Sequence, residues 1–199
     1  MTWSAYDDGY LRAHQWVQAL AGGAALPSEA SPVALGPGEI AHARLAPVSV
    51  SGHFGESGQY RRSFLLVGGP VGLALTGAAS LAHNASKKAE AQRAAIPRWH
   101  PLGNATVVAT NQRLVAIIGA KLESFPYAET GPLQLLVGPG GAPVVQFQPS
   151  GMPLMRLGSP WTPLLYVFVH HLIDGRPPAL PLPPGFLERA QAEGRLAAG

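Results

Sequence analysis

The chain has no cysteine and few charged residues among its 199 amino acids. Without cysteine there can be no disulfide, no thiolate zinc ligand and no cysteine nucleophile. Lysine, arginine, aspartate and glutamate make up 13% of the residues, which is about half of their usual share in a soluble domain. The net charge is +3, and no run of lysine and arginine is dense enough to bind a nucleic acid, since that requires several cations on one face. We therefore expect no nucleic-acid partner.

We also expect no secretory signal, because no basic segment in the N-terminal residues is followed by an apolar one. The lack of cysteine is compatible with a reducing compartment. These two observations favour a cytoplasmic protein. It could still be membrane-associated through an uncharged stretch at residues 64–82.

Glycine and proline are abundant, with 24 and 20 residues, and they separate short apolar runs. Short strands at regular spacing favour an antiparallel barrel or sandwich, so the predicted fold class is mainly β with helices (α+β). The β-rich domain spans residues 38–175. Apolar alternation predicts its strands within residues 39–51, 60–67, 105–109, 114–118, 121–127, 133–137, 144–148 and 154–157. We expect Val107, Leu114 and Ile117 in the core, with Trp99 packed at its edge.

Residues 3–21 have the spacing of an amphipathic helix. Ser4 is placed to cap its start, and Gly22-Gly23 to end it. A linker rich in alanine, proline, glycine and serine follows, so residues 1–37 precede the β-rich domain. The aromatic side chains of this helix pack either on the chain's own domain or on a partner, and in the second case the interaction residues are Tyr6, Tyr10 and Trp16.

The uncharged residues 64–82 are about as many as a bilayer-spanning helix requires. Their glycines and proline, however, lower the hydrophobicity of the stretch. We favour a strand that ends at Val67 and a helix over residues 70–95, whose small side chains allow another helix to approach closely. Gly77 and Ala78 are the candidate residues for self-association. The alternative is a membrane-associated module with residues 64–82 inserted.

Ser159 and Pro160 predict the start of another helix, over residues 160–173, with Phe168 facing the barrel. Residues 176–199 form a proline-rich tail, which we expect to be extended and to finish in a short helix from about 186 to 196. The proline-rich segment is either a stiff spacer or a ligand for an aromatic groove on a partner.

Residues 35–172 resemble the bacterial pleckstrin-homology-like (PH-like) domains. The resemblance implies a bent antiparallel barrel of seven strands with one end closed by a C-terminal helix. The predicted helix over residues 70–95 departs from the family, which has a short loop there. The matching features are Leu35-Gly36-Pro37-Gly38-Glu39, the strand pair joined through Thr110-Asn111-Gln112-Arg113, Phe125-Pro126-Tyr127, and the helix Pro160–Ile173.

By this resemblance, the chain is a binding or scaffolding module and not an enzyme. Relatives that bind phosphoinositides use basic residues around the first hairpin. The basic residues at the corresponding place are Arg44, Arg61 and Arg62. They are candidate interaction residues for an anionic membrane surface.

No residue pattern typical of catalysis or metal binding is found in the sequence. The glycines of residues 68–72 lack the spacing of a nucleotide-binding loop, and the histidines do not form the i, i+4 pair of a helical zinc site. We therefore expect no cofactor and no metal. The favoured function is a non-catalytic contact with a protein partner or with a second copy of the chain. An enzyme of unrecognised type that uses His53, His100 or Arg98 is the alternative.

Overall fold

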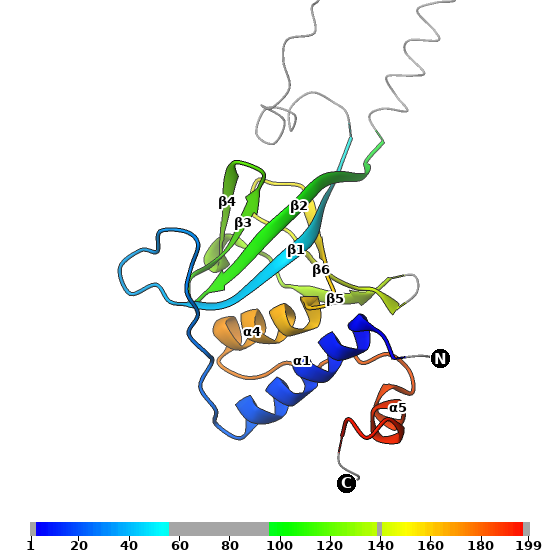
Figure 1. Cartoon of the computed structure of the whole chain (residues 1–199). Helices are drawn as coiled ribbons and strands as arrows, with labels where there is room; N and C mark the ends of the chain where they lie inside the picture. Colours follow the sequence, from blue (N-terminus) through cyan, green and yellow to red (C-terminus); the bar gives the residue numbers. More distant parts are fainter. Residues whose placement is uncertain (1–2, 56–95, 139–140, 197–199) are drawn as a thin grey trace, which may run out of the picture.

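The computed structural model describes residues 3–55, 96–138 and 141–196, which contain seven strands in one antiparallel sheet (Figure 1). The strand order is β4-β3-β2-β1-β7-β6-β5, so β4 and β5 form the two edges. The strands are β1 (Ala41–Phe54), β2 (Arg98–Thr110), β3 (Arg113–Ile118), β4 (Lys121–Pro126), β5 (Gln134–Val137), β6 (Pro143–Phe147) and β7 (Leu154–Gly158). The α+β class is confirmed.

The sheet is open, which corrects the prediction of a closed barrel. No ladder joins β4 to β5 in the part of the chain that the structure describes. Between these strands the chain leaves the extended conformation in a 3-10 turn, Tyr127–Glu129, and makes only the isolated bridge between Thr130 and Pro149 before the sheet resumes. β5 has four residues, and among the described strands it pairs with β6 alone.

The longest strands, β1 and β2, pair from Ala41 to Phe54 with three interruptions in register, one of them at residues 46 and 47. The sequence predicts only residues 105–109 of β2, because Pro101 and Gly103 resemble a turn. In the structure both residues lie within the strand, at an irregularity of its register, where Gly103 has φ of 115°. The predicted strand at residues 60–67 and the helix over residues 70–95 lie outside the described residues.

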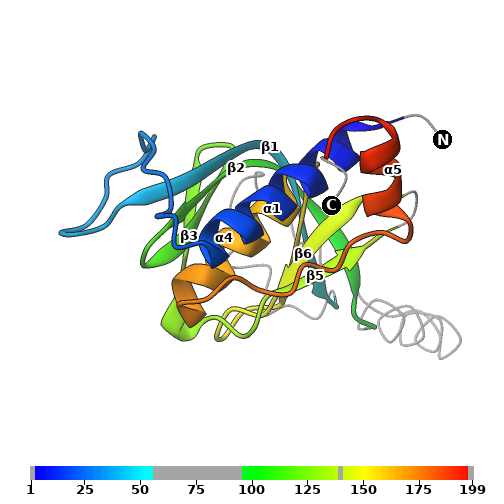
Figure 2. The same cartoon turned by 90° about the horizontal axis from the view of Figure 1, so that it is seen from below.

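Three helices complete the fold: α1 (Ala5–Ala21), α4 (Thr162–Asp174) and α5 (Phe186–Ala192). α4 lies against the sheet, and α1 packs on α4 from the outer side (Figures 1 and 2). α1 begins as predicted, since Ser4 and Asp7 form a reciprocal capping box. Among the described residues, no helix is long and apolar enough to cross a membrane.

The start of α4 differs from the prediction. Ser159 is not its N-cap; Trp161 occupies that position, and no side chain caps the helix. Ser159 instead shapes the preceding turn, where its Oγ accepts a hydrogen bond from the Trp161 N–H at 3.3 Å. The buried Thr162 hydroxyl lies 2.9 Å from the Pro143 carbonyl oxygen, which joins the helix start to β6. Phe168 is buried, as predicted.

The core lies between the sheet and the helices, and it contains Val107 and Leu114 as predicted. Ile117 is only half-buried, because residues three apart on a strand point to opposite faces. Trp99 is also half-buried and lies outside the core. The Arg156 guanidinium covers its ring at 3.8 Å from the centroid.

The N-terminal linker and the C-terminal tail both pack on the domain. Val33 and Leu35 of the linker cover a small apolar cluster on the outer face of the sheet. Residues 176–185 cross back from the end of α4 to α5 (Figure 2), and Phe186 of α5 is buried in the core. Neither segment is therefore separate from the β-rich domain.

Candidate functional site

A groove of about 400 Å³ lies between α1, β1 and the start of α4. One wall is the edge of β1 at residues 43–46, and the opposite wall is the first turns of α4. The remaining side chains come from α1 and from the linker. The groove residues are Arg12, Trp16, Pro27, Glu29, Ala43, Arg44, Leu45, Ala46, Trp161, Leu164 and Phe168.

Close packing of α1 against the start of α4 sets the shape of this groove. Gly9 faces the turn before α4, where an added Cβ would lie 1.7 Å from the Pro160 carbonyl oxygen. Only glycine permits this approach. One turn beyond the groove residue Arg12, the Trp16 ring meets Phe168 edge-on at 5.1 Å between centroids. The contact fixes Trp16 as part of the groove wall.

Two tryptophans give the groove an aromatic surface. Trp16 is half-buried and held by Phe168, whereas Trp161 is 41% exposed at the start of α4. An exposed tryptophan beside a hollow offers a large rigid surface to a ligand, and side chains of this type dominate binding energies at protein interfaces.

The charges of the groove are unbalanced. Arg12 and Arg44 are both exposed, and within the described residues neither makes an ion pair or a side-chain hydrogen bond. Glu29 is the one acidic side chain of the lining. An unpaired guanidinium presents a planar set of donors that fits a carboxylate in bidentate fashion. The groove is therefore suited to an anionic group beside an apolar one.

The structure brings together two of the predicted interaction residues, Trp16 and Arg44, in this groove. Tyr6 lies outside it, 37% exposed, beside a second hollow of about 300 Å³ next to β1 and β7. Tyr10 is only 1% exposed and packs in the chain's own core, which corrects its assignment as a contact residue for a partner. Burial raises its pKa to about 12. The other candidates, Arg61, Arg62, Gly77 and Ala78, lie outside the described residues.

Sequence reasoning missed Arg12 and Trp161 as groove residues. Arg12 belongs to the polar side of an amphipathic helix, which usually faces solvent. Trp161 lies next to a predicted helix start, where nothing local indicates exposure. No sequence pattern identifies such residues as part of a groove, because the groove exists only once the fold has placed α1 beside α4.

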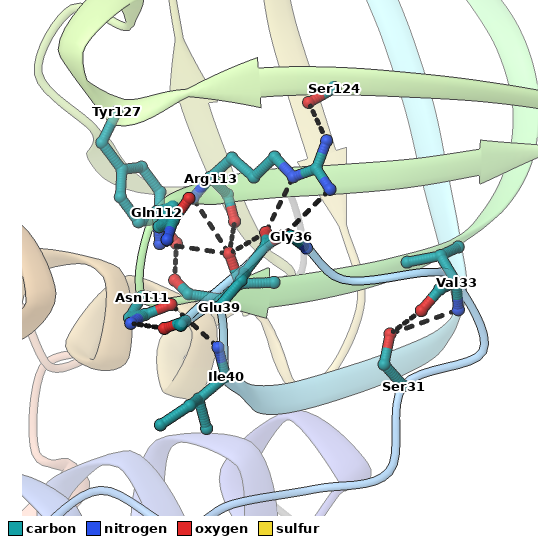
Figure 3. Close-up of polar contacts among 12 residues, drawn as sticks. Ser31, Val33, Gly36, Glu39, Ile40, Asn111, Gln112, Arg113, Ser124 and Tyr127 are labelled. Atoms are coloured by element: carbon teal, nitrogen blue, oxygen red, sulfur yellow. Dashed lines mark hydrogen bonds and ion pairs between the residues drawn. The ribbon is translucent and has the colours of Figure 1, made fainter.

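A second polar cluster joins two of the sequence motifs that carry the resemblance to PH-like domains (Figure 3). Glu39 ends the first motif and Arg113 ends the second. The Glu39 side chain is 1% exposed, and its Oε1 accepts a hydrogen bond from Arg113 Nε at 2.8 Å. Arg113 Nη2 donates to the other carboxylate oxygen at 3.0 Å.

The remaining acceptor positions of Glu39 are also used. The Thr110 hydroxyl donates to Oε1 at 2.8 Å, and the Gly36 N–H donates to Oε2 at 2.7 Å. The Arg113 hydrogen bond is the main reason that the pKa of Glu39 falls from 4.5 to about 2, although burial opposes this shift. A carboxylate with both oxygens engaged has no free lone pair for proton transfer, so this cluster stabilises the fold and is not a site for acid–base chemistry.

The residues named for an enzymatic alternative lie at the C-terminal end of β1 and at the N-terminal end of β2. The rings of His53 and Trp99 lie 5.0 Å apart between centroids, tilted by 45°, and His100 stacks on Phe54 at 4.4 Å between centroids. Arg98 has a partner in the structure. Within residues 3–55, 96–138 and 141–196, no three histidine, aspartate or glutamate side chains group as metal ligands would.

The chain was compared with protein families, with curated proteins and with solved structures. No family model, no curated protein and no solved structure matches the chain.

Proposed function

We propose that this chain is a non-catalytic interaction module of PH-like type, which binds a protein partner through the groove between α1, β1 and α4. The observation that carries the proposal is the convergence, in one hollow, of the exposed Trp161 with two arginines that have no partner among the described residues. Burying such side chains against a second protein would supply apolar area and charge pairing at the centre of an interface.

The PH-like type is supported by the order of the elements. Seven antiparallel strands precede a helix that packs on the sheet, as the resemblance implies. Two of the motifs quoted for the resemblance also lie in contact through Glu39 and Arg113. A contact of this kind requires the turn before β1 to meet the turn between β2 and β3, which is a specific arrangement of the first three strands.

The proposal is tested by recovering proteins from extracts of the source organism with the wild-type chain and with two groove variants, Trp161→Ala and Arg44→Glu. We expect at least one protein that binds the wild type and loses at least tenfold in affinity for each variant, measured by calorimetry with the purified partner. Leu122→Ala is the matched control, because Leu122 is 52% exposed on β4 and does not line the groove.

Light scattering of the purified chain distinguishes a second copy from another protein. If the wild type is monomeric and every protein recovered binds equally to the two groove variants, the groove is not the binding surface and the proposal is wrong. Unchanged circular dichroism and unfolding midpoints would show that the variants are folded.

A further inference from the structure

We infer that the segment of the partner that enters the groove is an acidic peptide in extended conformation, lying along the edge of β1. This inference rests on the proposed function and specifies its ligand. It is carried by two features that meet in the groove: a strand edge with no pairing partner among the described strands, and a pair of arginines without described counter-charges.

β1 is paired unequally on its two sides. β2 follows it from Ala41 to Phe54 with interruptions in register, one of them at residues 46 and 47, whereas β7 pairs only with residues 49–53. On the β7 side, no described strand pairs with residues 41–48. The chain turns away there, after Gly158, to begin α4. An unpaired edge of this kind presents backbone N–H and C=O groups to an added strand.

The groove follows this edge. Its lining includes Ala43 and Leu45, which are buried on the core side, and also Arg44 and Ala46, which are exposed on the outer side. Successive residues of a strand point to opposite faces. A hollow that contacts residues from both faces therefore lies along the strand edge and not over one face.

Both ends of the open edge are closed. At one end, the Glu29 N–H of the linker donates to the Ala41 carbonyl oxygen at 2.8 Å, so the linker already uses the edge there. At the other end lies Pro47, which has no N–H to donate. The register of β1 is also irregular between Leu45 and Val48. The regular span available is thus residues 43–45, enough to pair with a short extended segment of a partner.

Charge selects the composition of that segment. The backbone of α4 does not supply the positive potential, because its first N–H groups are already bonded: Trp161 to Ser159 Oγ, Thr162 to the Ser159 carbonyl, and Leu164 and Leu165 to the Trp161 carbonyl. Arg12 and Arg44 are therefore the groups that would recognise carboxylates. Trp161, beside them, would cover an apolar side chain of the same segment.

A display library of random twelve-residue peptides, selected on the full-length chain, tests this inference. We expect the selected peptides to be enriched in aspartate and glutamate, and their affinity to fall at least tenfold for Arg12→Glu and for Arg44→Glu. The control variant Arg176→Glu changes an exposed arginine that does not line the groove, and should bind as the wild type does.

Backbone methylation shows whether the peptide pairs as a strand. N-methyl groups placed one at a time along a selected peptide should abolish binding at every second position, because alternate N–H groups of an added strand face its neighbour. A structural role for the arginines would not produce this alternation. Equal effects at successive positions would overturn the strand geometry.

The remaining outcomes separate the inference from the proposed function. Peptides that bind and lose affinity for Trp161→Ala, but show no acidic enrichment, overturn the inference and leave the interaction module intact. A third outcome is that the library yields no peptide, while the wild type binds phosphatidylserine vesicles and the variants Arg12→Glu and Arg44→Glu do not. This outcome overturns the inference in favour of a membrane ligand. Absence of any groove-dependent peptide or protein ligand contradicts both proposals.

Discussion

At the scale of single residues, Glu39 shows how a buried charge is kept in this fold. Burying an isolated carboxylate costs on the order of several kcal/mol, because the ion loses its hydration. Glu39 avoids this cost because four donors surround its two oxygens, from Gly36, Thr110 and Arg113. The same bonds tie the turn before β1 to the turn between β2 and β3, so one side chain fixes the relative position of two segments distant in the sequence.

The variant Glu39→Gln should lower the free energy of unfolding by about 1.5–3 kcal/mol at pH 7, the range for hydrogen bonds to charged groups. The pKa of Glu39 is lower in the folded chain, about 2, than its usual value of 4.5. Its ionised form therefore stabilises the fold above pH 4.5, and this contribution is lost as the pH falls from 4.5 through about 2.

Urea unfolding of wild type and variant at pH 7 and at pH 3 measures this difference. The gap between the two proteins should be smaller at pH 3. Glu29→Gln is the control, since the Glu29 side chain is exposed and has no ion pair within the described residues. A gap that stays constant with pH would show that the ionisation of Glu39 does not contribute.

At the scale of elements, the placement of α1 depends on a glycine within the helix. Glycine at such a position usually costs about 1 kcal/mol relative to alanine, so local propensity alone favours Gly9→Ala. The tertiary contact reverses this expectation, because the Pro160 carbonyl oxygen occupies the space of the added methyl group. The contact brings α1 close to the start of α4, and both helices line the groove.

We expect Gly9→Ala to destabilise the chain by about 1–3 kcal/mol, as overpacking of a close contact does. Denaturant unfolding, followed by tryptophan fluorescence, reports the change, since Trp16 lies on the same helix. Gln15→Ala, at an exposed position of α1, should stay within about 0.5 kcal/mol of the wild type. A stabilised Gly9→Ala variant would mean that α1 does not approach α4 this closely.

At the scale of the whole molecule, the two ends of the chain close on each other. The Phe186 ring of α5 lies 5.9 Å from that of Trp3 and 6.0 Å from that of Tyr10. Arg189 of α5 also donates to Asp7 of α1 at 2.8 Å. The proline-rich tail thus returns to the helix that precedes the sheet, and it completes the core instead of leading away from it.

The variant Phe186→Ala should cost about 3–5 kcal/mol, the range for removing a buried aromatic ring. Leu187→Ala, at the neighbouring position, should change stability by less than about 1 kcal/mol, because Leu187 is 37% exposed. Thermal and urea unfolding of the two variants would distinguish them. Equal effects would show that α5 is not docked through Phe186.

Features that depend on a few neighbouring residues were predictable from the sequence. Ser4, Asp7 and Gly22 define α1 through capping, which acts within one turn of the helix. Alternation of apolar residues correctly indicates β4, β6 and β7, and the predicted end of α4 at residue 173 lies next to its last residue, Asp174. The α+β class follows from these local patterns.

The candidate site was predictable only in part. Trp16 and Arg44 stand out in the sequence as an aromatic residue of a helix and a basic residue of a strand, but their meeting in one groove is a tertiary fact. Arg12 and Trp161 give no local signal. The same holds for Glu39, since its partner Arg113 is far along the chain and nothing in either motif specifies the pairing.

The open edge of the sheet, the packing of the tail and the groove were decided by the tertiary structure. Each depends on where segments far apart in the sequence end relative to one another: β7 stops opposite Ser49, and α4 then begins beside the unpaired half of β1. Propensity, capping and alternation act over a few residues, whereas burial and steric contact act between whichever residues the chain brings together. The sequence by itself therefore determined the fold class and the capped start of α1, whereas the packing of distant segments determined the full length of β2, the open sheet and the groove.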